Sequence, residues 1–285
     1  MPLRLESAWV RRIPRSIYTY SVMAFVVAIC ILPIFWVLMS SFKTTFEILG
    51  NPFTPPSSLR FGLMKYAELL VERAAWRPMW NSIYIALLAT IFTLVIFGLA
   101  GYCFAKFRYR WVRVLFFLFV GGMLVPNHAQ VQPIFAIVFQ LGLYNSHGGL
   151  ILVYTSFGIA ISLFILRMAF MTIPKEVDEA AFIDGAGFVR VFWSINLPLA
   201  RGGIATAGIL NFLGYYNEYF YAAILLPSQR RRTMPVMLQD FTQQFTYDYT
   251  MMFAAIILAI IPGIIIYVLF TRQIQQSLGS SAIKG

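Results

Sequence analysis

The chain has 285 residues, of which 60% are hydrophobic, 17% aromatic and only 12% charged. Globular domains are on average about half apolar and about a quarter charged. A soluble protein of this length could not bury so much apolar side chain, so the composition excludes one and indicates an integral membrane protein. The net charge of +11 does not indicate nucleic-acid binding, because the basic residues are scattered between apolar runs.

Six apolar stretches are long enough to cross a membrane, which takes about 20 mostly apolar residues. Runs with few or no charges place them at roughly 17–40, 81–105, 113–139, 149–170, 201–226 and 249–271, the fifth being interrupted by Glu218. The third and fourth are divided at "LGLYNSHGG" (141–149), a segment rich in turn-forming residues. Pro126 and Pro133 are predicted to kink or break the third helix, which is tolerated at membrane depth where the backbone is buried or faces a cavity.

The positive charges predict the orientation of this all-α membrane fold. Six spans place both termini on one side, and fourteen of the 22 lysines and arginines then lie on that side. The positive-inside rule therefore favours cytoplasmic termini, with Arg230, Arg231 and Arg232 counting weakly against it. The predicted organisation is a cytoplasmic N-terminal segment at 1–16, a six-helix transmembrane domain at 17–271 and a cytoplasmic tail at 272–285. Because "MPLRLESAWVRR" lacks a small-residue cleavage site, no removed signal peptide is expected.

The only sizeable cytoplasmic loop, residues 171–200, is unusually polar for this chain. Pro174 suits the first turn of a helix. Negative charges at or just after that turn suit the positive end of the helix dipole, and three are present: Glu176, Asp178 and Glu179. Helical spacing predicts one shared face with small side chains, made of Val177, Ala180, Ala181 and Asp184.

The second half of the loop predicts a turn and another short helix. Gly185 and Gly187 can end the first helix in a left-handed turn. "FVRVFW" can then form a second helix before Pro198. The loop is therefore predicted to be a helix-turn-helix knuckle that protrudes from the membrane.

The spacing within this loop resembles the EAA loop of ABC importer permeases. The matching residues, in the order Glu-Ala-Ala, three residues, Gly, nine residues, Ile-x-Leu-Pro, are Glu179, Ala180, Ala181, Gly185, Ile195, Leu197 and Pro198. Nearly the whole chain is similar to the carbohydrate permeases of the maltose-transporter, MalG-like branch, including "SSFKTTFEIL", "NSIYIALLAT" and "YYNEYFYAAILL". The tail "SSAIKG" departs from the usual Gly-Ala-Val-Lys-Gly ending of that branch.

The resemblance implies a type I ABC importer permease fold in a prokaryotic cytoplasmic membrane. It implies that the knuckle, with Asp184 beside the residues named above, docks into a groove on a cytoplasmic ATPase subunit. The expected partners are two ATPase subunits, an extracytoplasmic solute-binding protein and a second, homologous permease, with a homodimer as the alternative. The long 41–80 loop is a candidate surface for the solute-binding protein.

The sequence contains no recognisable set of catalytic residues. No Gly-rich phosphate loop ending in Gly-Lys-Ser/Thr is present, so energy must come from a partner. ATP and magnesium are therefore expected in the partner ATPases, and no cofactor is expected in this chain. His128 and His147 lack acids or cysteines at ligand spacing, and Cys30 and Cys103 indicate neither a disulfide framework nor a metal site. We predict a transport subunit and not an enzyme.

Glu218 is the one acid inside a predicted span, and such carboxylates usually face a bundle interior or water. Aromatic rings and amides suit a sugar, so the candidate substrate-pathway residues are Tyr216, Asn217, Glu218 and Tyr219. The alternative is that these residues lie at the outer interface, where tyrosine is common.

Three functions fit the sequence. They are a sugar-importer permease, an ABC permease for a polyol, glycerol phosphate or other solute, and a proton-coupled carrier that uses Glu218. The carrier would lead us to expect internal inverted repeats and more membrane-buried acids, and neither is seen.

Overall fold

The structure is a computed structural model that describes residues 6–241 and 248–282, and every regular element in those residues is a helix. The chain divides into two compact units. The first consists of the chain up to Arg73 together with Phe241–Leu258, and the second of Ala74–Asp240 together with the chain from Ala259. Helix α15 (Tyr249–Ala282) contributes residues to both.

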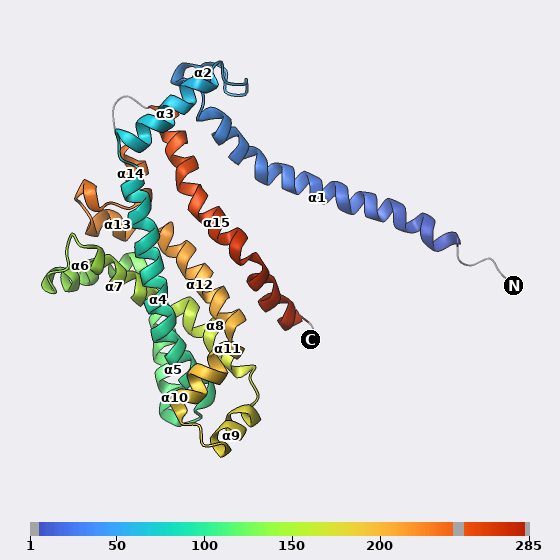
Figure 1. Cartoon of the computed structure of the whole chain (residues 1–285), viewed down its shortest axis with the longest axis vertical. Helices are drawn as coiled ribbons and strands as arrows, with labels where there is room; N and C mark the ends of the chain where they lie inside the picture. Colours follow the sequence, from blue (N-terminus) through green and yellow to red (C-terminus); the bar gives the residue numbers. More distant parts are fainter. Residues whose placement is uncertain (1–5, 242–247, 283–285) are drawn as a thin grey trace. The chain divides into compact units, whose positions relative to one another are not determined.

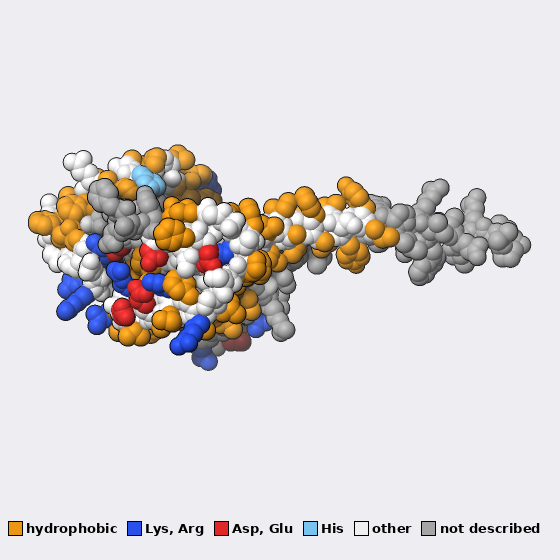
Figure 2. All heavy atoms as spheres, turned by 90° about the horizontal axis from the view of Figure 1, so that it is seen from above, with side chains coloured by type: hydrophobic (Ala, Val, Ile, Leu, Met, Phe, Trp, Pro, Cys, Tyr) orange, Lys and Arg blue, Asp and Glu red, His pale blue; other side chains and the backbone are white. Residues whose placement is uncertain are grey.

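The first unit begins with a long apolar helix, α1 (Glu6–Ser40). Its segment Ile17–Ser40 is long and apolar enough to span a membrane. Figure 2 shows hydrophobic side chains along the described part of this helix, and most of them are exposed, with Phe25 66% and Leu32 62% exposed. A helix that is apolar all round requires apolar surroundings, here the lipid or another membrane helix.

Short helices follow α1, namely α2 (Thr45–Gly50) and α3 (Leu59–Val71). A capping box starts α2: the Glu47 carboxylate accepts the Thr44 N–H at 2.7 Å, and the Thr44 hydroxyl accepts the Glu47 N–H at 3.3 Å. The same carboxylate accepts the Ser57 N–H at 3.2 Å. Hydrogen bonds from Ser57 and Thr44 lower the pKa of Glu47 to about 2.

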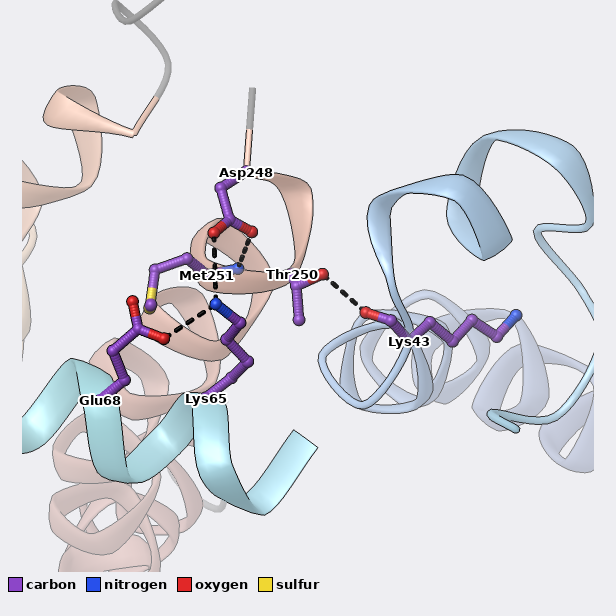
Figure 3. A network of polar contacts seen from close by, with 6 residues as sticks. All are labelled: Lys43, Lys65, Glu68, Asp248, Thr250 and Met251. Atoms are coloured by element: carbon purple, nitrogen blue, oxygen red, sulfur yellow. Dashed lines mark hydrogen bonds and ion pairs between the residues drawn. The ribbon is translucent and has the colours of Figure 1, made fainter. Parts of the chain in front are cut away.

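Polar contacts join the start of α15 to α3 and to Lys43, which lies three residues after α1 (Figure 3). The Lys65 Nζ lies 2.8 Å from the Glu68 carboxylate and 3.9 Å from that of Asp248. The Thr250 hydroxyl donates to the Lys43 carbonyl at 2.6 Å. The hydrogen bond between Thr250 and Lys43 joins segments that are 207 positions apart in the sequence.

In the second unit, α4 (Trp76–Lys106) packs along α8 (Ile159–Met171) and α12 (Arg201–Tyr216) (Figure 1). Small residues allow close approach, as in many membrane helix pairs. A Cβ atom at Gly101 of α4 would lie only 3.0 Å from the backbone nitrogen of Arg167 in α8. A Cβ atom at Gly203 of α12 would overlap the Cβ of Ala169 in α8.

Three of the six predicted spans are confirmed as single long helices, at Ile17–Ser40, Trp76–Lys106 and Tyr249–Thr271. The predicted third span is a bent pair. Helix α5 (Arg110–Gly122) meets the continuous segment of η1 (Asn127–Gln130) and α6 (Val131–Gln140) at 92°. Pro126 lies in this break, as predicted, whereas the prediction for Pro133 is wrong. Pro133 lies in the first turn of α6, where a missing N–H costs little.

The predicted fourth span is also bent. Helix α7 (His147–Phe157) meets α8 at 51°, and Gly158 lies at the bend. A Cβ atom there would overlap Thr93 of α4 and the hydroxyl of Tyr215 in α12, so the close approach requires glycine. The predicted turn before α7 is confirmed. Gly142 and Asn145 have φ of 67° and 52°, and the Ser146 hydroxyl caps α7 by accepting the Gly149 N–H at 3.1 Å.

The predicted fifth span is interrupted. Helix α12 ends at Tyr216, and the short α13 (Phe220–Leu225) begins only after Asn217–Tyr219. Counting each bent pair as one span gives up to five candidates in residues 6–241 and 248–282, so the count of six and the cytoplasmic termini stay predictions.

The arginine triplet that opposed the predicted orientation lies in a structured connection, formed by η3 (Gln229–Arg231) and α14 (Met234–Asp240). The Asn81 amide at the start of α4 donates to the carbonyls of Arg230 and Arg232, at 3.1 and 2.9 Å. The Arg232 guanidinium binds the Asp240 carboxylate at 2.7 Å. These contacts give the triplet a structural role beside its charge.

Candidate functional site

The polar loop folds as the predicted helix-turn-helix knuckle, at one end of the second unit (Figure 1). Its first helix, α9 (Lys175–Ile183), begins after Pro174. The helix closes with hydrogen bonds of 3.0 Å from the Gly185 N–H to the Phe182 carbonyl and from the Ala186 N–H to the Ala181 carbonyl. Gly185 has φ of 80°, the left-handed conformation that favours glycine.

The prediction for Gly187 is wrong. Its φ is −73°, so it precedes the next helix in an extended conformation and does not form the left-handed turn. The second half of the knuckle is a chain of short helical turns: α10 (Phe188–Val191), the π-helical η2 (Phe192–Asn196) and α11 (Leu197–Leu199). The wide π turn ends two residues before Pro198. A proline ring would collide with the carbonyl four residues earlier in a regular α-helix, which explains this local geometry.

The inner side of the knuckle is anchored by an ion pair. Asp178 is 8% exposed, and its carboxylate lies 2.7 Å from the Nζ of Lys106 at the end of α4. The same ammonium donates to the Ile173 carbonyl at 3.3 Å. One cation therefore fixes both the start of the knuckle and its first helix to the end of a long membrane helix.

Asn196 joins the second half of the knuckle to the first. It is fully buried, and its amide donates to the Asp178 carboxylate at 2.6 Å and to the Val191 carbonyl at 3.3 Å. We assigned no role to Asn196 or Lys106 from the sequence, and Asp178 only a favourable position in the helix dipole. The available signal for Asn196 was a polar residue at the variable position of the otherwise apolar Ile-x-Leu-Pro segment.

Aromatic rings form the base of the knuckle around Tyr102 of α4, which is 2% exposed. The ring centroid of Tyr102 lies 5.4 Å from that of Phe170 in α8. It lies 5.4 Å from Phe188 and 5.0 Å from Phe192, both in the knuckle. Rings at these separations pack favourably, so the base holds the knuckle on the membrane helices by apolar contact as well as by charge.

The predicted shared face of small residues is divided between two sides. Ala181 is buried at 7% exposure and Val177 is half-buried, whereas Ala180 and Asp184 are exposed. The predicted face is displaced by one position from the buried face of α9. The buried face is centred on Asp178 and Ala181, which lie on either side of Glu179 and Ala180 in the sequence.

The knuckle also exposes large apolar side chains, of which Phe182 and Ile183 follow Glu179 and Ala180 on α9. The exposed fractions are 86% for Ile183, 68% for Val189, 50% for Trp193, 47% for Phe182 and 41% for Phe188. We call these five residues the outer apolar face. Such a concentration on a polar loop outside the membrane helices is typical of a protein–protein contact surface.

The remaining predicted coupling residues lie between the two sides. Ile195 is half-buried, and Leu197 packs against the buried cluster around Tyr102 and Phe170. Pro198 is exposed. The predicted coupling residues therefore lie in one compact loop, with Glu179, Ala180, Asp184, Gly185 and Pro198 exposed and Ala181 buried.

Glu218, the candidate pathway acid, caps a helix. Its carboxylate accepts the N–H groups of Tyr221 and Ala222, at 2.9 and 3.2 Å, at the start of α13. It also accepts the hydroxyl of Tyr154, which is 1% exposed, at 2.7 Å. Carboxylates are stabilised at helix N-termini, and three donors satisfy this one in the interrupted helix.

The other candidate pathway residues differ in exposure. Tyr216 is 2% exposed and donates its hydroxyl to the Ala259 carbonyl at 2.9 Å. Asn217 and Tyr219 are exposed, and the Tyr219 hydroxyl contacts the Gln239 side chain. Asn217 and Tyr219 are accessible in this structure, whereas Tyr216 lies in the core.

The histidines take part in contacts between elements. His128 packs against Phe220 with ring centroids 4.7 Å apart. His147 contacts the Tyr84 hydroxyl, and its Nε2 lies 2.9 Å from the Arg231 carbonyl oxygen. In residues 6–241 and 248–282 no three His, Cys, Asp or Glu side chains form a group suited to a metal ion.

Comparison with known proteins identifies the family of the chain. Residues 98–280 match the family described as binding-protein-dependent transport system inner membrane component. The diacetylchitobiose uptake system permease protein NgcG of Streptomyces coelicolor is 32% identical over 258 residues, which cover 90% of this chain and 85% of that protein. The trehalose/maltose transport system permease protein MalG of Thermococcus litoralis is 31% identical over 261 residues, covering 90% and 92%.

A solved structure has the same fold. The crystal structure of a bacterial ABC transporter that imports the acidic polysaccharide alginate contains a chain that matches with a TM-score of 0.77. The match covers 95% of this chain and 99% of that one, at 23% sequence identity. The chain therefore belongs to the family of binding-protein-dependent transport system inner membrane components, as a multi-pass permease subunit in the cell membrane.

Proposed function

We propose that this chain is the permease subunit of an ATP-driven importer for a sugar or oligosaccharide, and that the knuckle transmits movement of an ATPase to the membrane helices. The observation that carries the proposal is the two-sided construction of the knuckle. Its inner side is fixed to α4 through Asp178, Asn196 and Lys106. Its outer side exposes the outer apolar face beside Glu179.

This construction suits a lever. A docked partner that moves the outer side must also move the inner side, since the buried ion pair and the packed rings leave little freedom between them. The force then reaches α4 at Lys106 and α8 at Phe170, on which Phe192 of the knuckle packs. Gly185 forms the turn between the helices of the lever.

The proposed assembly contains two ATPase subunits, which bind ATP and magnesium and hydrolyse the nucleotide. A solute-binding protein delivers the substrate outside, and a second, homologous permease completes the pathway. Exposed apolar side chains on α1 and, separately, on α5 support contact with lipid or with a partner permease, since Phe25 of α1 is 66% exposed and Phe117 of α5 is 63% exposed.

The sugar assignment is supported by the relatives, whose names give diacetylchitobiose, trehalose and maltose as transported solutes. Relatives named for lactose and for sulfoquinovosyl glycerol extend the set to other glycosides. A polyol or glycerol phosphate is less well supported, because no relative named here carries one. The exposed amide of Asn217 and ring of Tyr219 are the groups of this chain best suited to meet a sugar.

Proton coupling through Glu218 receives no support from its surroundings. A carboxylate that exchanges protons during transport needs access to water on both sides in turn. The Glu218 carboxylate is instead engaged by the helix that it caps and by buried Tyr154. We therefore assign Glu218 a structural role in the interrupted helix.

The docking step is tested by co-purification of the ATPase with a tagged permease. Ile183→Asp places a charge on the most exposed member of the outer apolar face, so we expect ATPase retention and ATP-dependent uptake to fall about tenfold or more. The matched control for ATPase retention is Leu49→Asp, because Leu49 is a 65% exposed apolar residue of the other compact unit. Normal ATPase retention by a stably inserted Ile183→Asp protein would contradict the proposal.

The substrate class is tested with the solute-binding protein of the same transport system. Binding of neutral mono- and oligosaccharides, and no binding of glycerol phosphate, is the expected result. The reverse preference would reject the sugar assignment without affecting the docking result.

A further inference from the structure

A basic cleft lies beside the knuckle, at the same end of the second unit. It has a volume of about 550 Å³ and lies between the end of α4, the start of α5 and the end of α8. Its lining includes Arg108, Tyr109, Arg113, Phe116 and Arg167. Phe107 also lines the cleft and stacks on Phe188 of the knuckle at 5.6 Å, which places the cleft and the knuckle side by side.

The cleft concentrates positive charge without an internal counter-charge. Three arginines line it, and none of its lining residues is Asp or Glu. In residues 6–241 and 248–282, Arg108, Arg113 and Arg167 take part in no salt bridge, unlike Lys106 one position before the cleft-lining Phe107. The charge of these guanidinium groups is therefore available to an external anion.

Arg167 is held in place inside the cleft. Its guanidinium lies 4.4 Å from the ring centroid of Phe116, and its Nε donates to the Phe104 carbonyl at 3.4 Å. These contacts use the face and one N–H of the group, so the remaining donors stay free. A planar guanidinium with free N–H groups suits a phosphate, which it can bind through two parallel hydrogen bonds.

The cleft continues into apolar surface along α5. Phe117 lines the cleft and is 63% exposed, and Leu118 next to it is 66% exposed. Tyr109, which also lines the cleft, and Trp111 two positions later are 70% and 71% exposed, which is typical of residues at the membrane–water interface. The basic groups thus lie where an apolar helix leaves the membrane.

We propose that this cleft binds the headgroup of an anionic phospholipid, with the phosphate at Arg108, Arg113 and Arg167 and the acyl chains along α5. Charge and position both favour this ligand. Basic groups at the membrane surface attract anionic lipids by about 1 kcal/mol each. The apolar continuation at Phe117 and Leu118 suits acyl chains, which a free phosphate compound lacks. The proposal does not depend on the coupling function of the knuckle.

The test is native mass spectrometry of the full-length permease, purified in complex with its partner subunits. The protein is released in the spectrometer from micelles that contain both phosphatidylglycerol and phosphatidylcholine. We expect the wild type to retain phosphatidylglycerol in preference to phosphatidylcholine. Arg113→Gln combined with Arg167→Gln should reduce that retention about tenfold, and the matching double Lys substitution should restore much of it. Arg60→Gln, an exposed arginine of the other unit, is the matched control and should retain the lipid as the wild type does.

A second arm distinguishes the two sources of a phosphate group. Millimolar inorganic phosphate should leave the lipid in place, since phosphate has no acyl chains to hold it at α5. Displacement of the lipid by inorganic phosphate would reassign the cleft to a soluble anion and overturn the lipid proposal. Equal retention of both lipids by the wild type, or an equal loss in Arg60→Gln, would also overturn it.

Discussion

The knuckle and the interrupted helix at Asn217–Tyr219 hold their carboxylates by different means. Asp178 in the knuckle faces a full positive charge, the Lys106 ammonium at 2.7 Å, together with the Asn196 amide. Glu218 in the interrupted helix faces neutral donors, namely the Tyr154 hydroxyl and the N–H groups of Tyr221 and Ala222. The first arrangement joins two separate elements, and the second ends one helix and starts the next.

The two carboxylates therefore have different roles: Asp178 helps to transmit movement, and Glu218 fixes the local course of the backbone. A charge-to-charge contact between α9 and α4 resists separation of the knuckle from the membrane helices, so it suits a part that is pushed and pulled. Capping of α13 by Glu218 fixes where the backbone turns, without linking the break to a moving partner. Variants at the two acids should therefore fail in different ways.

The largest effect is expected from removing one member of the ion pair. Lys106→Met leaves the Asp178 carboxylate buried without its cation, which should lower the free energy of unfolding by about 3–5 kcal/mol. Combining it with Asp178→Leu removes the unpaired charge and should recover part of that loss. Thermal unfolding midpoints in detergent measure both, with the exposed Lys175→Met as the control. Equal midpoints for Lys106→Met and Lys175→Met would show that the pair does not hold the knuckle.

The next effect concerns Glu218. Replacement by Leu leaves the Tyr154 hydroxyl and the first N–H groups of α13 without their acceptor, and each buried unsatisfied group costs about 1–3 kcal/mol. Glu218→Gln keeps one acceptor oxygen and should cost about 1 kcal/mol. We expect reduced thermal stability for Leu and near-normal uptake for Gln.

Substrate-stimulated ATPase activity, at matched expression, separates the roles of the two acids. Glu218→Gln should keep ATPase activity coupled to substrate, whereas Lys106→Met should weaken the coupling itself. A stable and fully active Glu218→Leu protein would show that this residue neither stabilises the fold nor lines the substrate pathway. That result is expected if Glu218 lies at the outer membrane interface.

A smaller effect is expected at the turn of the knuckle. Gly185 has φ of 80° and open space around its α-carbon, so a side chain there costs backbone strain and no collision. Gly185→Val should lose about 1–2 kcal/mol and some ATPase retention, while Gly185→Asn should lose less because asparagine tolerates this conformation. Gly187→Ala is the matched control, since Gly187 is extended. Equal behaviour of Val and Ala variants would contradict the proposed role of the turn.

The smallest effect is expected at a third carboxylate, Glu47, which is held by hydrogen bonds alone at the protein surface. Hydrogen bonds from Ser57 and Thr44 lower its pKa from 4.5 to about 2. A lowered folded-state pKa contributes stability above pH about 4.5, and this contribution is lost as the pH falls toward about 2. The protection of the Ser57 amide, meaning its exchange rate relative to that of an unstructured peptide at the same pH, should therefore fall over this window in the wild type. The matching Glu47→Gln protein should show no such change, and an identical change in it would contradict the assignment.

Much of the knuckle could be predicted from the sequence, because its signals are local. The Glu-Ala-Ala spacing, the glycine turn at Gly185 and the proline that ends the segment all act within a few residues of the chain. The contacts that anchor it could not be predicted in the same way. Lys106 lies 72 positions before Asp178 along the chain, and only the packing of α4 against the knuckle brings their charged atoms together.

In the membrane helices, too, local features could be predicted from the sequence and contacts between helices could not. Long charge-free runs correctly predicted the three unbroken spans, since length and apolarity decide those. The bend at Gly158 depends on Thr93 and Tyr215 from two other helices, which no local pattern reveals. The break after Tyr216 depends on Tyr154, which provides a buried partner for Glu218.

Cysteine accessibility tests most directly whether the outer side of the knuckle is the docking surface and its inner side the anchor. In a background with Cys30 and Cys103 replaced by serine, Ile183→Cys, Ala181→Cys and the control Leu49→Cys are labelled with a maleimide, with and without the ATPase. We predict that Ile183→Cys reacts quickly in the permease alone and at least about tenfold more slowly in the complex. Ala181→Cys, which is 7% exposed as alanine, should react slowly in both, and Leu49→Cys should react equally in both. Unchanged labelling of Ile183→Cys in the assembled complex would contradict docking at this surface.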